Sequence, residues 1–162
     1  MKVKEVMMGT PYYCQVNTNL GSATELMWSG NCGFLPVMGE EGRIIGVVTD
    51  RDVCIALGTR NRPAGEITAR EVMSSRLFAC APDDDVHIAL ETMKEGGVRR
   101  LPVLARDGVL AGVISMDDIL LRAQPSGIGK HPELSSEEVV KAYRAINQRQ
   151  VPQIVLARGA AV

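Results

Sequence analysis

The sequence repeats itself at a fixed spacing of 66 residues. Leu35-Pro36-Val37 returns as Leu101-Pro102-Val103, and the match extends back to Glu5-Val6-Met7, which returns as Glu71-Val72-Met73. A repeat of this period is the signature of a duplicated structural unit, and it constrains the fold more than any single residue does. The chain is therefore a tandem duplication, and we expect its function to reside between the two copies.

Each copy shows the same order of secondary structure: strand, helix, strand, strand, helix. Apolar segments bounded by Gly, Pro and Asp turn signals indicate the strands. The predicted strands are 12–16, 34–38 and 44–48 in the first copy and 77–81, 100–104 and 110–114 in the second. The middle strand of each copy contains a proline, which predicts a sheet edge or a bulge there.

Helix signals follow the strands in both copies. Thr18 in the first copy and the run 83–85 in the second are candidate N-caps, because their side-chain oxygens can accept first-turn amide hydrogen bonds. Val86, Ala89, Leu90 and Met93 recur at helical spacing after the second of these caps. The second helix of each copy is expected to start at Thr49 or Ser115.

The fold class that this order predicts is mixed α/β (α+β), built from two βαββα repeats. One unit of about 55 residues buries too little apolar surface to be comfortably stable alone, so we expect the copies to pack face to face. The expected boundaries are 1–58 for repeat 1, 59–67 for a linker, 68–123 for repeat 2, 124–134 for a second linker, and 135–162 for a C-terminal helix and tail.

The C-terminal region begins with a capping box. Ser135 and Glu138 have the spacing at which each side chain can accept a hydrogen bond from the other residue's backbone amide. The segment 151–156 is apolar, and we expect it to dock on its own domain or on a partner subunit.

Charge and hydropathy exclude several functional classes. The net charge is −1, so no basic field favours nucleic acid or an anionic membrane surface. No run approaches the ~20 apolar residues of a membrane span. The first residues lack the apolar core of a signal peptide, and the expected localisation is cytoplasmic.

The four cysteines, at positions 14, 32, 54 and 80, show no CxxC spacing and no histidine at zinc-like spacing. Reduced, mostly packed thiols are the expectation in a cytoplasmic protein, and no metal site is predicted. The chain also has no nucleophile–base pair and no Walker loop, so we do not expect an enzyme.

The motif Thr/Ser-x-x-Asp occurs once per copy, as Thr49 to Asp52 and Ser115 to Asp118. Taken singly, each motif resembles a helix capping box, although such boxes prefer Glu or Gln at the last position. Its recurrence within the whole repeated pattern favours a ligand site in at least one copy.

The repeated pattern, from Leu35-Pro36-Val37 to Asp52 and from Leu101-Pro102-Val103 to Asp118, resembles the cystathionine-β-synthase (CBS) domain. The resemblance covers roughly residues 1–123 and is closest to small stand-alone bacterial and archaeal proteins made of one CBS pair. It implies two βαββα repeats packed through their sheets about a pseudo-two-fold axis, an arrangement called a Bateman module. Pairs of this family often associate further as dimers.

The resemblance also implies a ligand. The family typically binds adenine nucleotides (AMP, ADP or ATP), and sometimes S-adenosylmethionine, in clefts between the copies, as a regulatory ligand and not as an obligatory cofactor. Carried across by motif, Asp52 and Asp118 would hold the ribose, and Thr49 and Ser115 would reach a phosphate. The implied adenine walls would come from Cys14, Gln15, Val16, Leu35 and Pro36 of the first copy and from Cys80, Ala81, Leu101 and Pro102 of the second.

The two copies differ in charge at this implied site. Arg51 precedes Asp52, whereas Asp117 precedes Asp118 and would repel a phosphate placed beside it. Arg99 and Arg100 stand where the first copy has Gly33 and Phe34, and a guanidinium fork suits a phosphate. We therefore expect unequal clefts, with phosphate charge met by Arg51, Arg99 or Arg100.

These observations predict a regulatory module that senses an adenine nucleotide or a related adenosyl ligand. Ligand would shift the population of arrangements of the copies or subunits, and an unknown protein partner would read the change. A homodimer is expected. The alternative is a ligand-free structural dimer, or a redox-responsive one that uses its cysteines and its apolar tail.

Overall fold

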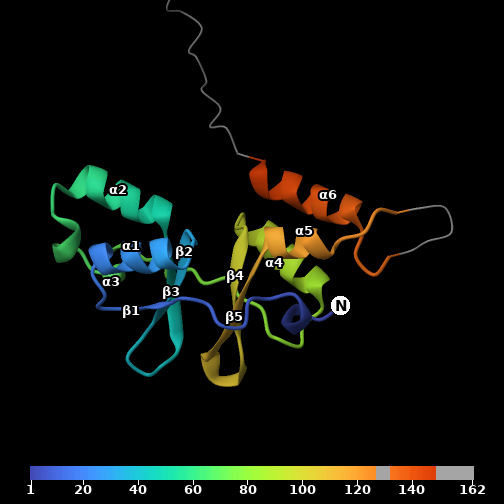
Figure 1. Ribbon diagram of the computed structural model, residues 1–162, viewed down its shortest axis with the longest axis horizontal. Helices are drawn as coiled ribbons and strands as arrows, with labels where there is room; N and C mark the ends of the chain where they lie inside the picture. The colour runs from blue at the N-terminus through green and yellow to red at the C-terminus, as the bar shows by residue number, and fades with distance from the viewer. Residues whose placement is uncertain (127–131, 149–162) are drawn as a thin grey trace, which may run out of the picture.

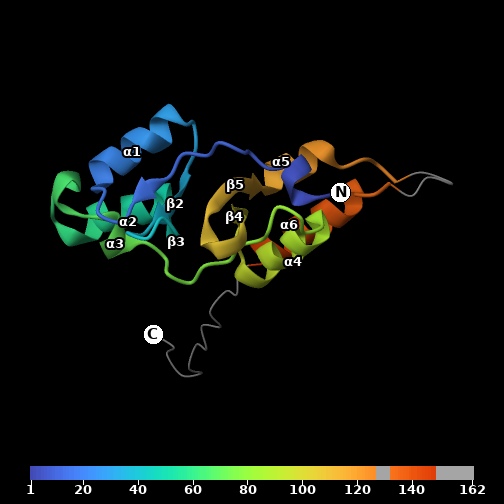
Figure 2. The same cartoon turned by 90° about the horizontal axis from the view of Figure 1, so that it is seen from below.

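A computed structural model describes residues 1–126 and 132–148. Two lobes lie side by side, and each has its own apolar core (Figures 1 and 2). Strands and helices occur in both, which confirms the predicted α/β class and the paired arrangement. The predicted apolar tail segment 151–156 lies outside the described residues.

The first lobe is built on a three-stranded sheet in the order β1-β2-β3. Its elements are β1 (Cys14–Gln15), α1 (Leu20–Ser29), β2 (Phe34–Met38), β3 (Ile44–Thr49), α2 (Asp50–Arg60), η2 (Ala64–Glu66) and α3 (Ala69–Val72). β1 runs parallel to β2, and β3 runs antiparallel to it with Phe34 opposite Thr49. The start of β2 and the end of β3, where α2 begins, therefore lie together.

The second lobe repeats this plan around a two-stranded sheet. Its elements are η1 (Val3–Glu5), α4 (Val86–Gly96), β4 (Arg100–Leu104), η3 (Arg106–Gly108), β5 (Leu110–Ser115), α5 (Met116–Arg122) and α6 (Ser136–Asn147). Arg100 pairs with Ser115, as Phe34 pairs with Thr49 in the first lobe.

The strand predicted at 77–81 is reduced to a single bridge between Cys80 and Val103. In the first copy, the Val16 amide donates to the Met38 carbonyl and extends the pairing of β1. The equivalent residue in the second copy is Pro82, which has no N–H to donate. The missing donor shortens the strand.

The opening segment of each copy packs on the lobe formed by the other copy. Val3 and Val6 are buried in the second core, while their equivalents near α3 pack in the first core. The N-terminus accordingly lies at the second lobe (Figure 2). α2 extends to Arg60 and Ile67 is fully buried, so both ends of the expected linker 59–67 are part of the first lobe.

The caps observed at the helix N-termini confirm most of those predicted from the sequence. Asp85 caps α4, and Ser135 forms a capping box with Glu138 at the start of α6. The prediction of Thr18 as a cap is wrong, because Asn19 accepts from the Ser22 amide and caps α1. Thr18 Oγ1 instead accepts from the Gln15 amide at 3.0 Å and closes the preceding turn.

α6 makes the two lobes unequal. It packs against α4 and α5, and its residues Val139 and Ala142 are buried in the second core (Figure 1). The equivalent helices of the first lobe, α1 and α2, have no such cover among the described residues, and the Trp28 side chain on α1 is 87% exposed.

Candidate functional site

The Thr/Ser-x-x-Asp motifs form the N-terminal caps of α2 and α5. Asp52 Oδ2 accepts hydrogen bonds from the Thr49 amide at 2.9 Å and from Thr49 Oγ1 at 2.7 Å. Asp118 Oδ2 accepts the same pair from Ser115 at 2.8 and 2.6 Å. Among the described residues these bonds use only Oδ2 of each carboxylate, so Oδ1 can still accept from a ligand hydroxyl.

The caps restrict the hydrogen bonds that the Thr49 and Ser115 hydroxyl groups can make to a ligand. Each has one hydrogen, which Thr49 donates to Asp52 and Ser115 donates to Asp118. Each hydroxyl oxygen also accepts from the amide of the same aspartate, at 3.2 Å in the first copy and 3.1 Å in the second. Thr49 or Ser115 can therefore donate to a phosphate only if its cap rearranges.

A cleft of about 220 Å³ lies between the two copies beside the start of α5. Its second-copy lining is Arg100, Val113, Ser115, Asp117 and Asp118, and its first-copy lining is Met8, Pro11, Tyr12, Gly30, Asn31, Cys32 and Phe34. The polar groups come mainly from one copy and the aromatic rings from the other. Such a mixture of apolar walls and a few polar groups is typical of a small-molecule site.

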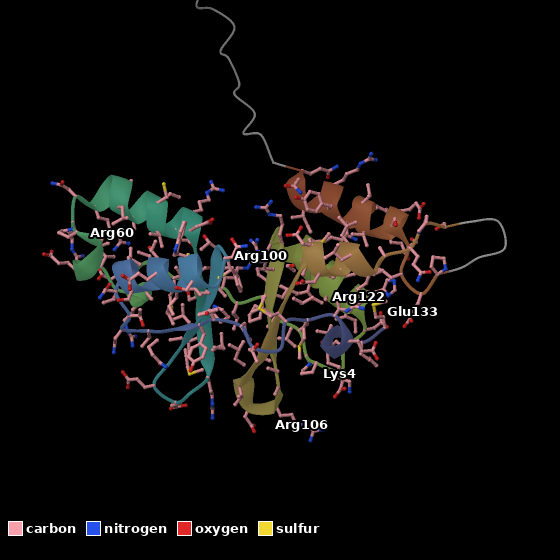
Figure 3. All side chains as sticks on the ribbon, viewed as in Figure 1. Lys4, Arg60, Arg100, Arg106, Arg122 and Glu133 are labelled. Carbon is pink, nitrogen blue, oxygen red and sulfur yellow. The ribbon has the colours of Figure 1, made fainter. Side chains whose placement is uncertain are left out.

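The two neighbouring arginines of the second copy have different surroundings. Arg100 lines the cleft and lies between the lobes (Figure 3). Arg99 is exposed, and its Nη1 is 3.5 Å from the Tyr143 hydroxyl oxygen on α6. Of the three candidate phosphate ligands, Arg51, Arg99 and Arg100, the structure brings only Arg100 together with Ser115 and Asp118.

Tyr12 is held in the cleft by a close contact that sequence reasoning missed. A Cβ at Gly30 would lie 2.6 Å from the Tyr12 ring, so the ring packs where only glycine leaves space. Phe78 packs on Gly96 in the same way at the equivalent positions of the second copy. An aromatic residue and a glycine that both recur in the repeat are the signal that could have identified this wall.

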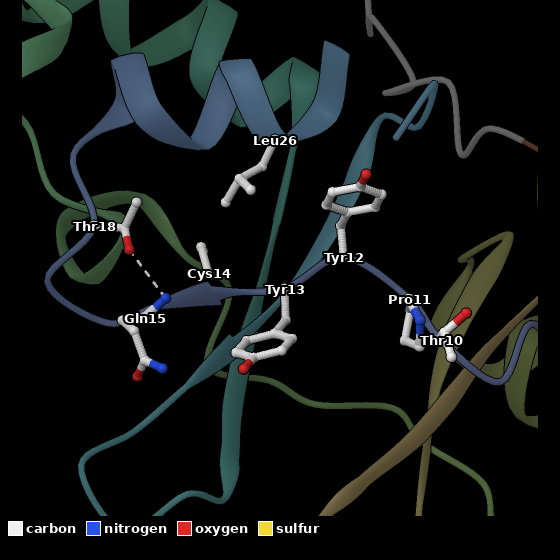
Figure 4. A pocket seen from close by; sticks show the side chains of 8 residues that line it. All are labelled: Thr10, Pro11, Tyr12, Tyr13, Cys14, Gln15, Thr18 and Leu26. Carbon is white, nitrogen blue, oxygen red and sulfur yellow. Dashed lines mark hydrogen bonds between the residues drawn. The ribbon is translucent and has the colours of Figure 1, made fainter. Parts of the chain in front are cut away.

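The candidate residues of the first copy do not line this cleft. Thr49, Arg51 and Asp52 lie at the start of α2 and are not part of its lining, although Thr49 pairs with Phe34, which is. Cys14 and Gln15 line a separate hollow of about 430 Å³, together with Tyr12, Tyr13 and Leu26 (Figure 4). The structure thus gathers one motif, that of Ser115 and Asp118, into a cleft between the copies.

Most of the implied adenine-wall residues lie in the two cores. The exposed fraction of each side chain is between 0 and 6% for Cys14, Val16, Leu35, Cys80 and Leu101. Pro36 and Pro102 are buried too, and Ala81 is partly buried. Tyr12 and Phe34 supply the aromatic wall of the cleft in their place.

Burial also makes two of the cysteines unreactive. Desolvation raises the pKa of the Cys14 thiol to about 11 and that of the Cys80 thiol to about 12. Because the thiolate is the reactive form, both thiols are inert at neutral pH. A redox role for this repeat-equivalent pair is therefore disfavoured.

The described residues contain neither a candidate metal site nor a membrane-spanning helix. Within residues 1–126 and 132–148, no group of three or more His, Cys, Asp or Glu side chains could hold a metal ion. No helix in the same ranges is long and apolar enough to cross a bilayer.

The fold and the cleft define a duplicated two-lobe module whose copies exchange their opening segments. A family model for the CBS domain matches residues 3–59 and residues 69–124, once per copy. The chain belongs to the CBS-domain family, as a tandem pair.

Two relatives match half or more of this chain. YlbB of Bacillus subtilis is 30% identical over 125 residues, which cover 76% of this chain and 82% of that protein. Protein MK0525 of Methanopyrus kandleri is 33% identical over 88 residues, or 54% of this chain. That match spans only 45% of the length of MK0525.

Solved structures share the fold. The CBS domain pair of protein MJ0100, in complex with 5′-methylthioadenosine and S-adenosyl-L-methionine, superposes with a TM-score of 0.67 at 22% identity, covering 74% of this chain and 92% of that one. The CBS domain protein PAE2072 of Pyrobaculum aerophilum, complexed with AMP, gives a TM-score of 0.66 at 21% identity, covering 74% and 90%.

Proposed function

We propose that this protein is a regulatory module that binds an adenosyl ligand in the cleft between its copies. The observation that carries the proposal is the cleft itself, which gathers Ser115 and Asp118 with Tyr12 and Phe34 of the other copy. A carboxylate oxygen can accept from ribose hydroxyls, and an aromatic ring can stack on a base. The site thus offers one group for each half of a nucleoside.

Two proteins of the same fold support the ligand class. MJ0100 was crystallised with 5′-methylthioadenosine and S-adenosylmethionine, and PAE2072 with AMP. All three ligands contain an adenosyl group. We extend that class, an adenine nucleotide or S-adenosylmethionine, to this chain as a regulatory ligand, with no obligatory cofactor.

The proposed mechanism is a population shift between arrangements of the two lobes. A ligand that contacts Tyr12 on one copy and Asp118 on the other favours the arrangement in which both are in reach. The shift can be no larger than the difference in affinity between the two arrangements. A partner protein reads the favoured arrangement, and the module itself catalyses no reaction.

The first lobe offers a surface for association of two copies. In the second lobe α6 covers the helical face, whereas the α1–α2 face leaves Trp28 87% exposed beside a hollow that Cys54 also lines. Exposed apolar surface of this kind usually marks an interface. We include in the proposal a homodimer formed through the α1–α2 faces.

A thermal unfolding series tests the proposed ligand class. A ligand that binds only the folded protein raises its melting temperature with concentration. We expect AMP, ATP, 5′-methylthioadenosine or S-adenosylmethionine to raise it, and guanosine and uridine monophosphates to leave it unchanged. Equal shifts with all nucleotides would show that the cleft does not recognise adenine, contrary to the proposal.

A further inference from the structure

The cleft at Ser115 carries more negative than positive charge. The charged side chains in its lining are Arg100, Asp117 and Asp118. Arg100 offsets one carboxylate and leaves the other uncompensated. At the position equivalent to Asp117 the first copy has Arg51, which has the opposite charge.

A phosphate in this cleft would find the cap groups at the start of α5 already engaged, and the uncharged side-chain donors in the lining are the Asn31 amide and the Tyr12 hydroxyl. The Ser115 hydroxyl and the Ser115 and Asp118 amides are engaged in the cap. Arg100 is then the one cationic side chain in the lining, and two carboxylates stand with it.

The cleft is also too small for a ligand to avoid Asp117. The cleft has a volume of about 220 Å³ and Asp117 is part of its lining, so a bound group lies within about one Debye length of this carboxylate, about 8 Å at physiological salt. Any group bound there therefore experiences the field of Asp117. The volume is also below the ~300–1,000 Å³ of most drug-sized pockets, which suits a compact ligand.

We infer that the Ser115 cleft selects adenosyl ligands that carry no phosphate, such as a 5′-thioether or a 5′-sulfonium, and that Asp117 sets this preference. The inference rests on the proposed function and makes it more specific. A neutral thioether loses no affinity through charge repulsion beside the Asp117 carboxylate, and a sulfonium cation is attracted by it. A phosphate dianion is repelled, by about fivefold in affinity for each unit of its charge.

Calorimetric titration with two probes that differ mainly at the 5′ position tests this selectivity. The probes are 5′-methylthioadenosine and AMP, used at low ionic strength so that the charge effect is not screened. An Asp52→Ala background removes the motif carboxylate of the first copy, so the remaining binding reports the Ser115 cleft. We expect this protein to bind 5′-methylthioadenosine at least about fivefold more tightly than AMP.

Asp117→Arg gives the second copy the residue that the first copy has at this position. We expect it to raise AMP affinity by at least about fivefold and to change 5′-methylthioadenosine affinity little. Glu40→Arg is the matched control. It makes the same charge change in the exposed turn after β2, where the second copy has Arg106, and Glu40 does not line the cleft.

The outcomes separate this inference from the proposed function. Equal affinity for the two probes, unchanged by Asp117→Arg, would overturn the inference while adenosyl binding stands. Binding that disappears altogether in Asp52→Ala would also overturn it, because the first copy would then hold the only working cleft. No binding of either probe to the folded wild-type protein would overturn the proposed function and the inference with it.

Discussion

Met8 and Val113, from opposite copies of the repeat, exchange two backbone hydrogen bonds with N···O distances of 2.9 and 3.0 Å. Ser74 and Val47 make the equivalent pair at 2.9 and 3.1 Å. Each opening segment thus pairs with the last strand of the other copy. The cleft lies beside one of these junctions, since both Met8 and Val113 line it.

The crossing of Met8 over β5 requires glycine at position 112. A Cβ there would lie 2.6 Å from the Met8 carbonyl oxygen, a backbone atom that cannot move alone. We expect Gly112→Ala to lower the free energy of unfolding by about 1–3 kcal/mol, the usual cost of overpacking. Urea denaturation measures the change.

Gly58→Ala is the control for Gly112→Ala. Gly58 lies within α2, and no atom would come within 4 Å of an added Cβ. The same substitution there should raise the free energy of unfolding by about 0.5–1 kcal/mol, because alanine favours the helix. If both variants changed stability in the same direction, the close crossing would not be the cause.

Ser115 should affect both stability and ligand binding. Ser115→Ala removes the cap of α5 and should lower the free energy of unfolding by about 0.5–2 kcal/mol. Ser135→Ala removes an equivalent cap from α6, with the same three hydrogen bonds to Glu138. Both variants should lose similar stability in urea, and only Ser115→Ala should weaken adenosyl binding. Equal binding by the two variants would show that Ser115 acts only as a structural cap.

Asp85 links the opening segment to the acid stability of the second lobe. Hydrogen bonds from the His87 amide and ring, together with the nearby N-terminal ammonium group, lower the Asp85 pKa from 3.8 to about 2. A carboxyl group whose pKa is lowered in the folded state stabilises that state at pH values above its ordinary pKa. This stabilisation is lost as the pH falls toward 2.

Asp85→Asn keeps a residue that caps helices well but removes this titration. We expect wild-type protein to be more stable than the variant above about pH 5, with a difference that shrinks as pH falls toward 2. Urea unfolding across that range measures it. Asp107→Asn, in the exposed turn before β5, is the charge-matched control. A wild-type advantage that stayed constant with pH would contradict the assignment.

Trp28 reports association through the first lobe. It is the one tryptophan in the chain, and its side chain is 87% exposed. We expect its fluorescence to shift to shorter wavelength as protein concentration rises, and Trp28→Glu to sediment as a monomer. Leu121→Glu alters a similarly exposed apolar residue of α5 and should leave association unchanged. Loss of the dimer in Leu121→Glu alone would place the interface on the second lobe.

Local pattern was enough to predict the order of elements and the caps at Asp85 and Ser135. The exchange of opening segments could not be predicted, because both copies carry nearly the same segment. Packing Val3 on either lobe buries the same kind of residue, and only the recurring glycine at 46 and 112 marks the crossing.

The motif residues of the site could be predicted from the sequence, but the aromatic residues that form its walls could not. Ser115, Asp118 and Arg100 were candidates, and the structure places all three along one cleft. Arg99 could not be separated from Arg100, because Arg99 lies just before β4 and the face to which each side chain points depends on a register that local sequence does not specify. Tyr12 and Phe34 became walls through contact between the copies, which local sequence does not specify.

The most direct test is calorimetric titration of nucleotide-free protein with AMP, ATP, 5′-methylthioadenosine and S-adenosylmethionine, on wild type and on Asp118→Ala. Ser135→Ala is included as a variant with a lost cap outside the cleft. Our account predicts saturable binding of at least one ligand, weakened about tenfold or more in Asp118→Ala and unchanged in Ser135→Ala. No binding of any of the four ligands to folded protein, or equal binding by all three proteins, would contradict it.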